Sequence, residues 1–517
     1  MEQEKIKTET KTEVKIPKKG KILPYIFYTL FILVFLWVLG QLFFQKEIEV
    51  IENMAHSLFG VNQVEKVDIE NLRVVFPNEP AVLDPRDGDP VARQRLVNIY
   101  QPLVKFDAFY NLRPCLALSW GMIDDLTWEF NLRPDVVFHD GSKFDAYDVD
   151  STLDSQFIDS FESFEIVDDL TIRIKTKYPD PLMLQKLALI LIYSDEAEDL
   201  SYPIGTGSYK YNAYEDSVMT LDKFDDYWGE ESKFETVELI TIPDKSDRVN
   251  AFLSGDADML AFVSYDAVQI VQEFGFEIAT IPTLEVQLIM FNFASEYLSN
   301  IKNRELISYI IDQDALVEKV GGYARPVNQF VSNGIFGFDS SISNHEFDLE
   351  KAEALAVETG LQGKTLQLHL PIGLDVLGEH IRENLAEVGV NVIVSYLQIP
   401  DFIDSIDNGR ADFYFMGFKS ELGDSSEFLE TTLHSEGDYN TFDYENSNVD
   451  YLIDLAAEEL DPGKRREALQ EAMRVVVEDD VVGVPLFEYE TVYSFVEELD
   501  FSPRIDGLIN FDEINIK

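Results

Sequence analysis

The residue types that carry out catalysis or bind metals do not form a recognisable group in this sequence. Its six histidines are scattered over 517 residues, and no His-Glu-x-x-His, Gly-x-Ser-x-Gly, Walker loop or paired-cysteine motif occurs. His139 precedes Asp140-Gly141 in a turn-forming stretch, where a structural hydrogen bond is its expected role. We therefore predict a protein that is not an enzyme, with no catalytic residues, metal site or cofactor.

Four aspartates have a spacing that resembles a calcium-binding loop: Asp145, Asp148, Asp150 and Asp154. However, Asp150 stands where an EF-hand loop requires glycine, and the bidentate glutamate of that loop would be replaced by glutamine. We expect these acids to cap a helix or to face solvent.

A second stretch, Tyr202 to Tyr209, contains the glycines Gly205 and Gly207 and could suggest a phosphate-binding loop. No Lys-Ser or Lys-Thr pair follows it, and no helix is expected to start there. This stretch predicts a tight turn between strands.

Composition narrows the range of partners. The formal net charge is −55 and the isoelectric point is near 4.2, so the surface repels phosphate backbones and nucleic acid is excluded as a partner. Cys115 is the single cysteine, so no disulfide forms within the chain, and a buried thiol is expected.

Residues 22–44 form an uncharged apolar run, about 23 residues long, which suffices for a helix to cross a hydrocarbon core of about 30 Å. A cleavable signal peptide is the alternative, but its apolar region is shorter and ends in small residues. Here the run ends in Leu42-Phe43-Phe44, which is bulky. Lysines precede the run and glutamates follow it, which places the N-terminus in the cytoplasm. We predict a cytoplasmic tail (1–21), a transmembrane helix (22–44), a stalk (45–70) and an extracytoplasmic remainder, periplasmic or at the cell surface.

The remainder alternates strand and helix patterns. Trp128, Phe130 and Leu132 alternate with polar residues as in a half-buried strand. Val136 to Phe138 predicts a second strand, and Asp145 is positioned to cap a helix that starts at Ala146. Further expected elements are strands at 72–76 and 170–175 and helices at 248–258 and 462–479. This pattern predicts an α/β fold.

Several of these segments resemble the family 5 extracellular solute-binding proteins, the peptide-binding receptors of ABC importers. Residues 128–141 follow that family's W-x-F-x-L-R-x-x-V-x-F-H-D-G pattern, and Leu83-Asp84-Pro85 matches its L-D-P opening. The resemblance extends over about residues 72–503, although the chain is shorter than usual between Thr152 and Ser163. It implies a two-lobed, three-domain periplasmic-binding-protein type II fold, with ligand held between lobes that close by a hinge. The implied domains are domain I of lobe 1 (71–97, 198–283 and 488–517), the small domain II of lobe 1 (98–197) and domain III, or lobe 2 (284–487).

The resemblance also implies a ligand site. Residues 412–429 are similar to the family's G-W-x-x-D-x-x-D-P-x-x-F-L segment, in which the first aspartate pairs with the α-ammonium group of a peptide. Glu421 takes that aspartate position, and it is one methylene longer; an exposed loop acid is the alternative. The other implied ligand-binding residues are Phe418 at the tryptophan position, Lys419, Ser420 and Asp424. In the family, residues some five to seven positions after the aspartate of the L-D-P motif contact the peptide. This offset implies Asp89 and Val91 as further ligand-binding residues, and an ordinary turn at these positions is the alternative.

The resulting expectation is a membrane-anchored binding protein that captures dipeptides or oligopeptides, or another small solute, for an ABC permease complex. Its third partner would be the lipid bilayer, through residues 22–44. A membrane-anchored sensor or scaffold that uses the same cleft is the alternative. The short, lysine-rich tail contains no domain, which argues against autonomous signalling.

Overall fold

The computed structural model describes residues 70–155, 158, 160–197 and 199–517. The predicted cytoplasmic tail (1–21), the predicted transmembrane helix (22–44) and the predicted stalk up to residue 69 lie outside this part of the chain. Within it, no helix is long and apolar enough to cross a membrane. The described residues group into one compact unit.

The largest sheet has eleven strands of mixed direction, in the order β15-β14-β16-β12-β17-β11-β1-β10-β9-β8, with β13 paired to β17. Its bounds are β1 (Asn71–Phe76), β8 (Tyr209–Glu215), β9 (Val218–Lys223), β10 (Thr236–Thr241), β11 (Met259–Leu260), β12 (Glu277–Phe291), β13 (Ala324–Pro326), β14 (Thr365–Pro371), β15 (Asn391–Leu397), β16 (Phe413–Lys419) and β17 (Gly483–Phe495). The expected strand at 72–76 is thus confirmed as β1.

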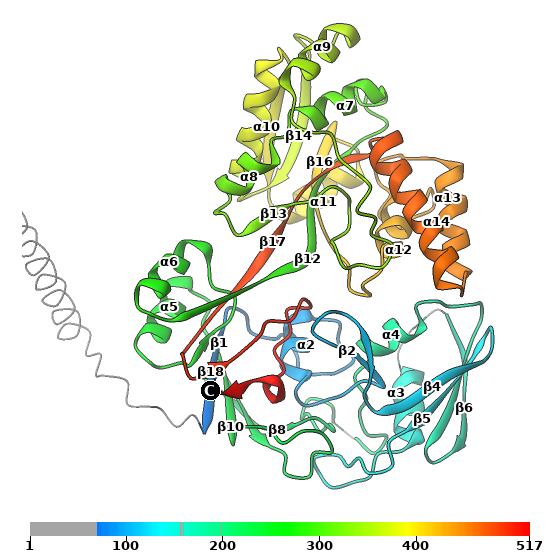
Figure 1. Cartoon of the computed structure of the whole chain (residues 1–517), viewed down its shortest axis with the longest axis vertical. Coiled ribbons are helices and arrows are strands. Elements are labelled where there is room, and N and C mark those ends of the chain that lie inside the picture. Colours follow the sequence, from blue (N-terminus) through cyan, green and yellow to red (C-terminus); the bar gives the residue numbers. More distant parts are fainter. Residues whose placement is uncertain (1–69, 156–157, 159, 198) are drawn as a thin grey trace, which may run out of the picture. The chain divides into compact units, whose positions relative to one another are not determined.

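Two long antiparallel strands, β12 and β17, connect the two halves of this sheet (Figure 1). Their pairing shifts register between Pro282 and Val286. Such a bulge bends a strand and increases its local twist. The chain therefore changes direction at residues 283–285, between the two halves.

A separate four-stranded antiparallel sheet has the order β4-β5-β7-β6. Its strands are β4 (Ala117–Asp124), β5 (Thr127–Leu132), β6 (Phe161–Asp168) and β7 (Thr171–Thr176). The expected alternating strands are confirmed in β5 and β7. Phe130, Ile172 and Ile174 from this sheet pack in a core with Leu153 of helix α3 (Ala146–Ser155).

The expected strand at Val136–Phe138 is not formed; only an isolated bridge joins Val137 to Lys143. The chain reverses too soon for a longer ladder, because the amide of Phe138 donates to Ser142 O at 2.8 Å and Gly141 has φ of +89°. The remaining short strands are β2 (Val104–Phe106), β3 (Leu112–Pro114), β18 (Leu499–Asp500) and β19 (Asn515–Ile516).

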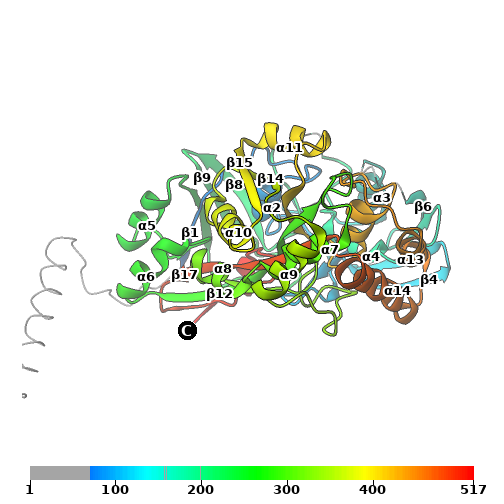
Figure 2. The same cartoon turned by 90° about the horizontal axis from the view of Figure 1, so that it is seen from above.

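The helices cover these sheets, and α13 and α14 lie side by side in both views (Figures 1 and 2). Their bounds are α2 (Pro90–Leu96), α4 (Met183–Leu189), α5 (Lys245–Leu253), α6 (Tyr265–Glu273), α7 (Ile301–Tyr309), α8 (Gln313–Lys319), α9 (Leu349–Thr359), α10 (Asp375–Glu387), α11 (Ile399–Asp407), α12 (Ser426–Phe428), α13 (Ser447–Glu458) and α14 (Pro462–Arg474).

Two expected helices have different bounds. The helix expected at 248–258 starts earlier, at Lys245, because Asp244 caps the amides of Ser246 and Asp247. It ends at Leu253, before Gly255, which has φ of +81°. The long helix expected at 462–479 is α14 followed by a π-helical turn, Val475–Asp479. A second π-helical turn, Leu429–Leu433, follows α12, and a 3-10 turn spans Phe511–Glu513.

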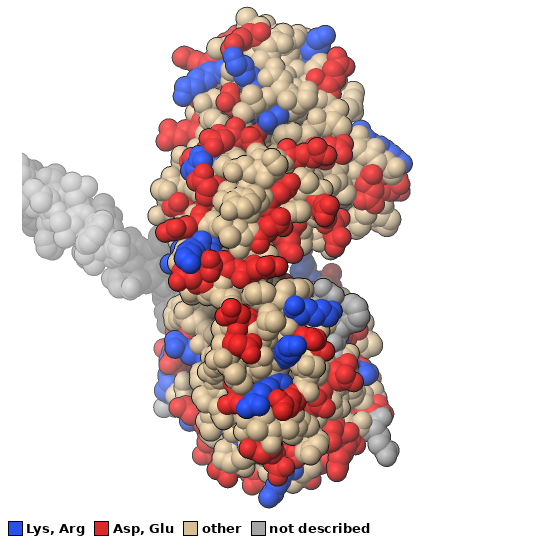
Figure 3. Space-filling model, turned by 90° about the vertical axis from the view of Figure 1, so that its right-hand side faces the viewer, with Lys and Arg blue, Asp and Glu red and all other residues tan. Residues whose placement is uncertain are grey.

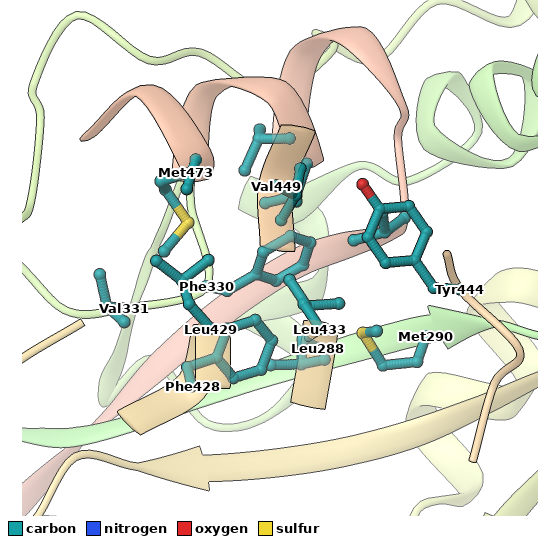
Figure 4. Close-up of a cluster of buried hydrophobic side chains, with 14 of the residues drawn as sticks. Leu288, Met290, Phe330, Val331, Phe428, Leu429, Leu433, Tyr444, Val449 and Met473 are labelled. Carbon is teal, nitrogen blue, oxygen red and sulfur yellow. The ribbon is translucent and has the colours of Figure 1, made fainter. Parts of the chain in front are cut away.

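One core lies between β12 and the helices beside it. Leu288 and Met290 of β12 pack with Phe428 and with Leu429 and Leu433 of the following turn (Figure 4). Phe330 stacks on Phe428 with ring centroids 5.1 Å apart. This packing holds the chain immediately after β16, where the sequence places its candidate site.

The expectations for Cys115 and His139 are confirmed. Cys115 is buried, and burial raises the pKa of its thiol to about 11. His139 has a structural role: its Nδ1 accepts from the amide of Gly205, and its Nε2 bonds to Gly207 O at 3.1 Å. Burial lowers the pKa of His139 to about 4, so the ring is neutral.

Asp145 and Asp148 act at the start of α3, as expected of capping acids. Asp145 accepts from the amide of Tyr147 at 2.8 Å. Asp148 is buried and accepts from the amides of Asp145 and Asp195. Burial raises the pKa of Asp148 to about 7.

Gly205 and Gly207 are part of a turn that leads into β8. The amide of Gly207 donates to Ile99 O at 2.7 Å. A Cβ on Gly205 would lie 2.1 Å from Ile99 O, so only glycine allows this approach. The tight turn predicted between Tyr202 and Tyr209 is therefore present.

The acidic composition is visible on the surface. On the face shown in Figure 3, carboxylate side chains are spread over most of the protein, with lysine and arginine in smaller groups. Such a surface favours solubility and repels anionic polymers.

Candidate ligand-binding site

A cavity of about 480 Å³ lies where β12 changes register. The other parts of the chain that meet there include the end of β1, helix α2, the loop after β2, the end of β16 and the segment near residue 506. Its charged lining residues are Arg93, Arg95, Glu285, Lys419, Glu421 and Asp506. Its size is within the range typical of small-molecule sites.

Three of the predicted site residues, Lys419, Glu421 and Val91, line this cavity. The ammonium group of Lys419 is 3.2 Å from the carboxylate of Glu421, and the Glu421 side chain is 50% exposed. Lys419 is the last residue of β16, and in the sheet it lies opposite Glu285 of the neighbouring strand β12. Glu285 also lines the cavity. The carboxylate of Glu421 is thus accessible to a solute.

Phe418 and Ser420 do not line the cavity. Phe418 packs against the core, with its ring edge-to-face to Phe428 at 5.0 Å, and Ser420 is 1% exposed. The reason is strand alternation, since neighbouring side chains on an extended chain point to opposite faces. Only Lys419 and Glu421 of this run share the cavity side.

Ser420 has a supporting role in the loop that carries Glu421. Its hydroxyl donates to Glu427 Oε2 at 2.5 Å, and the amides of Glu421 and Leu422 donate to the same carboxylate at 3.2 and 2.9 Å. Burial raises the pKa of Glu427 to about 6, and these hydrogen bonds oppose the rise. The ionised Glu427 fixes the backbone of Glu421.

Asp424 also lies away from the cavity, and its carboxylate is fully buried. Arg465 of α14 grips it with two hydrogen bonds, of 2.5 and 3.0 Å. Asp424 also accepts from the amide of Ser426 at the start of α12. Because both carboxylate oxygens are engaged, the geometry gives Asp424 a structural role rather than a direct ligand contact.

Of the two residues predicted by offset from the L-D-P motif, Val91 lines the cavity and Asp89 does not. Asp89 caps α2, accepting from the amide of Val91 at 2.9 Å. Asp89 therefore has the role of an ordinary turn residue, which was the alternative interpretation of this position. By capping α2, Asp89 orients the helix that contributes Val91.

The sequence interpretation missed the arginines of α2. Arg93 donates to Leu189 O at 2.5 Å and to Ala188 O at 3.1 Å, at the end of α4. Arg95 is 1% exposed, donates to Asn78 O, and lies over the ring of Phe76 at 3.7 Å. Burial lowers the pKa of Arg95 to about 10. Two arginines on a short helix just after the L-D-P motif were the signal available.

Tyr110 was also missed. Its hydroxyl donates to Glu421 O at 2.8 Å, and its ring stacks on Phe106 with centroids 4.2 Å apart. Tyr110 has φ of +64°, an uncommon conformation for a bulky residue. It therefore bridges the loop after β2 and the loop after β16, on the wall of the cavity.

Comparison with known proteins gives the family. The model of bacterial extracellular solute-binding proteins, family 5, matches residues 111–440. The chain belongs to this family. It is 25% identical to the dipeptide-binding protein of Escherichia coli over 481 residues, which cover 81% of this chain and 89% of that protein.

A second relative has a different ligand in its name, and a solved structure shares the fold. The glutathione-binding protein of Pectobacterium atrosepticum is 25% identical over 430 residues, covering 75% of this chain and 83% of that protein. The structure of HbpA2 from Haemophilus parasuis superposes with a TM-score of 0.80 at 21% identity, covering 86% of this chain and 100% of that one. The predicted periplasmic-binding-protein type of α/β fold is confirmed. The relatives from Escherichia coli and Pectobacterium atrosepticum are named as binding proteins.

Proposed function

We propose that this family 5 protein captures short peptides outside the cytoplasm and delivers them to an ABC permease. The observation that carries the proposal is the cavity at the β12 bulge, into which Glu421 presents an accessible carboxylate. An anion in a partly closed site suits the terminal ammonium group of a peptide. The name of the Escherichia coli relative supports the same ligand class.

The binding energy would come from few contacts. A charge-assisted hydrogen bond between Glu421 and an ammonium group would contribute roughly 1.5–3 kcal/mol. The main chain of an extended peptide would add strand-like hydrogen bonds, which give affinity without side-chain selectivity. Lys419 pairs with Glu421 and would have to share this carboxylate with the ligand.

We also propose that the cavity opens and closes about the strands that cross the molecule. In this arrangement, 71–97, 198–283 and 488–517 form one domain, 98–197 the small second domain, and 284–487 the second lobe. The bulge in β12 and its partner β17 would serve as the hinge. Tyr110, which bridges residues assigned to the two lobes, would help to hold the closed form.

Anchoring belongs to the same proposal. Residues 22–44 would keep the protein at the membrane, next to its permease, with the binding unit outside. The ligand supply to the permease would then depend on a receptor held at the membrane surface.

Mass spectrometry of small molecules released by denaturing the purified full-length protein tests this function. We expect short peptides in the released fraction, and calorimetric titration of the emptied protein with those peptides should show saturable binding. Release of a single non-peptide solute, with no binding of added di- and tripeptides, would contradict the proposal.

A further inference from the structure

The cavity has an end that the ammonium-binding role of Glu421 does not explain. Arg93 and Arg95 both line it from helix α2, whereas Glu421 enters from the loop after β16. These two arginines also differ from the other charged lining residues in the groups that they contact.

The acids of the lining are occupied by other groups. Glu421 pairs with Lys419 at 3.2 Å, and Asp506 pairs with Arg504 at 2.7 Å. The Oε1 atom of Glu285 accepts from Gln287 at 2.8 Å. Within the described part of the chain, neither Arg93 nor Arg95 has a carboxylate within ion-pairing distance; both donate only to backbone carbonyl oxygens.

This arrangement is notable for a chain with 96 acidic residues and 41 basic ones. A guanidinium carries five N–H donors, and two of those on Arg93 are used. Three therefore remain, and two donors of one guanidinium can hold a carboxylate in a bidentate pair. Arg93 and Glu421 line the same cavity of about 480 Å³, so one short ligand can reach both groups.

We propose that the α2 end of the cavity is a carboxylate subsite, with Arg93 contacting the anion and Arg95 adding positive charge behind it. The ligand would have one end at Glu421 and a carboxylate at α2. This inference rests on the proposed function, and adds to it the direction of the ligand and a requirement for a free acid.

The carboxylate could belong to the C-terminus or to an acidic side chain. Three peptides distinguish these sources: trialanine, trialanine with an amidated C-terminus, and Ala-Ala-Asp with an amidated C-terminus. Calorimetric titration of each into the full-length protein compares them directly.

The matched variants are Arg93→Gln and Arg248→Gln. Arg248 is also buried and donates only to carbonyl oxygens, those of Ile242 and Pro243, but it does not line the cavity. Both variants therefore lose hydrogen bonds from a guanidinium to backbone carbonyl oxygens, but only Arg93→Gln removes a charge from the cavity lining. Arg93→Lys retains the charge without the bidentate fork, and thermal unfolding of each variant checks its fold.

We expect C-terminal amidation to weaken binding to the wild type and to Arg248→Gln about 10-fold or more. The same amidation should change binding to Arg93→Gln little, with Arg93→Lys in between. Recovery of affinity with the amidated aspartyl peptide would show that a side chain can supply the anion.

Two negative outcomes are distinct. Equal binding of trialanine and its amide to the wild type would overturn the carboxylate subsite and leave peptide capture standing. No binding of any of the three peptides would overturn peptide capture, and this inference with it.

Discussion

At the scale of single residues, the candidate site depends on a difference between two acids three positions apart. Glu421 is half-exposed on the cavity wall, whereas Asp424 is buried against Arg465. One is available to a ligand, and the other stabilises the fold. Substitutions at the two positions should therefore have different effects.

Glu421→Gln removes a charge with little change of shape. We expect peptide binding to weaken by about 1.5–3 kcal/mol, or roughly 10- to 150-fold, because a charge-assisted hydrogen bond is lost. The free energy of unfolding should not change, since the side chain is outside the core. Calorimetry with free and N-acetylated peptide tests this, with Glu353→Gln, on the exposed face of α9, as the control.

The N-acetylated peptide decides the role of Glu421. Acetylation should weaken binding to the wild type and affect Glu421→Gln much less, because both changes remove the same interaction. Equal losses in the two proteins would mean that Glu421 does not hold the amino terminus.

The raised pKa of Glu427 should make both the stability of the fold and the affinity for ligand depend on pH. Burial raises its pKa to about 6 from the ordinary value of 4.5. The folded state binds this proton more tightly than the unfolded state, so this group lowers stability as pH rises from about 4.5 to 6. Ligand binding should change in the opposite direction, because only the carboxylate accepts from both loop amides and Ser420.

We therefore expect peptide affinity to fall as pH decreases through about 6, with the loop around Glu421 loosened by protonation. Glu427→Gln should show the weaker affinity at all pH values and should lose the transition near 6. Calorimetry between pH 5 and 8 measures this. A wild-type affinity that is constant over this range would contradict the prediction.

At the scale of elements, the loop after β16 is tied to α14. Arg465 of α14 donates to Asp424 and to Ser426 Oγ, and it also holds Ala456 O near the end of α13. One side chain thus joins the start of α12 to the α13–α14 pair. The position of the ligand loop depends on this contact, 41 residues away along the chain.

Arg465→Met should destabilise the protein by about 3–5 kcal/mol, because it leaves a buried carboxylate without its partner. Urea unfolding measures this, and Arg382→Met, which breaks an exposed pair with Glu379, provides the comparison. A similar unfolding midpoint for both variants would show that the buried pair contributes no more than a surface pair.

At the scale of the whole molecule, β12 and β17 connect the two halves of the large sheet, and the cavity lies at the bulge between them. A binding protein that closes about such strands can report occupancy to a partner through its shape. The proposed anchor would keep that surface near the membrane.

The anchor makes a simple prediction. N-terminal sequencing of protein extracted from membranes should find a start before residue 22, because Leu42-Phe43-Phe44 lacks the small residues of a cleavage site. A start beyond Phe44 would mean that the apolar run is a cleaved signal peptide.

The sequence by itself determined the elements whose signals are local. The alternation of Trp128, Phe130 and Leu132 predicted β5, and the capping position of Asp145 predicted the start of α3. These signals depend on neighbours along the chain, so no knowledge of the fold is needed to read them. The motif resemblance likewise placed Glu421 and Val91 in the candidate site, on the cavity that the structure forms.

Only the tertiary structure decided what each charged residue of the site contacts. Asp424 meets Arg465, 41 residues away, and Arg93 meets Leu189, 96 residues away. A carboxylate or guanidinium is available to a ligand only if no residue that is distant in sequence already binds it. The sequence alone does not reveal which residue that is. For this reason the sequence interpretation predicted Asp424 as a ligand contact and missed Arg93. In the structure, Asp424 pairs with Arg465 of α14, and Arg93 lines the cavity.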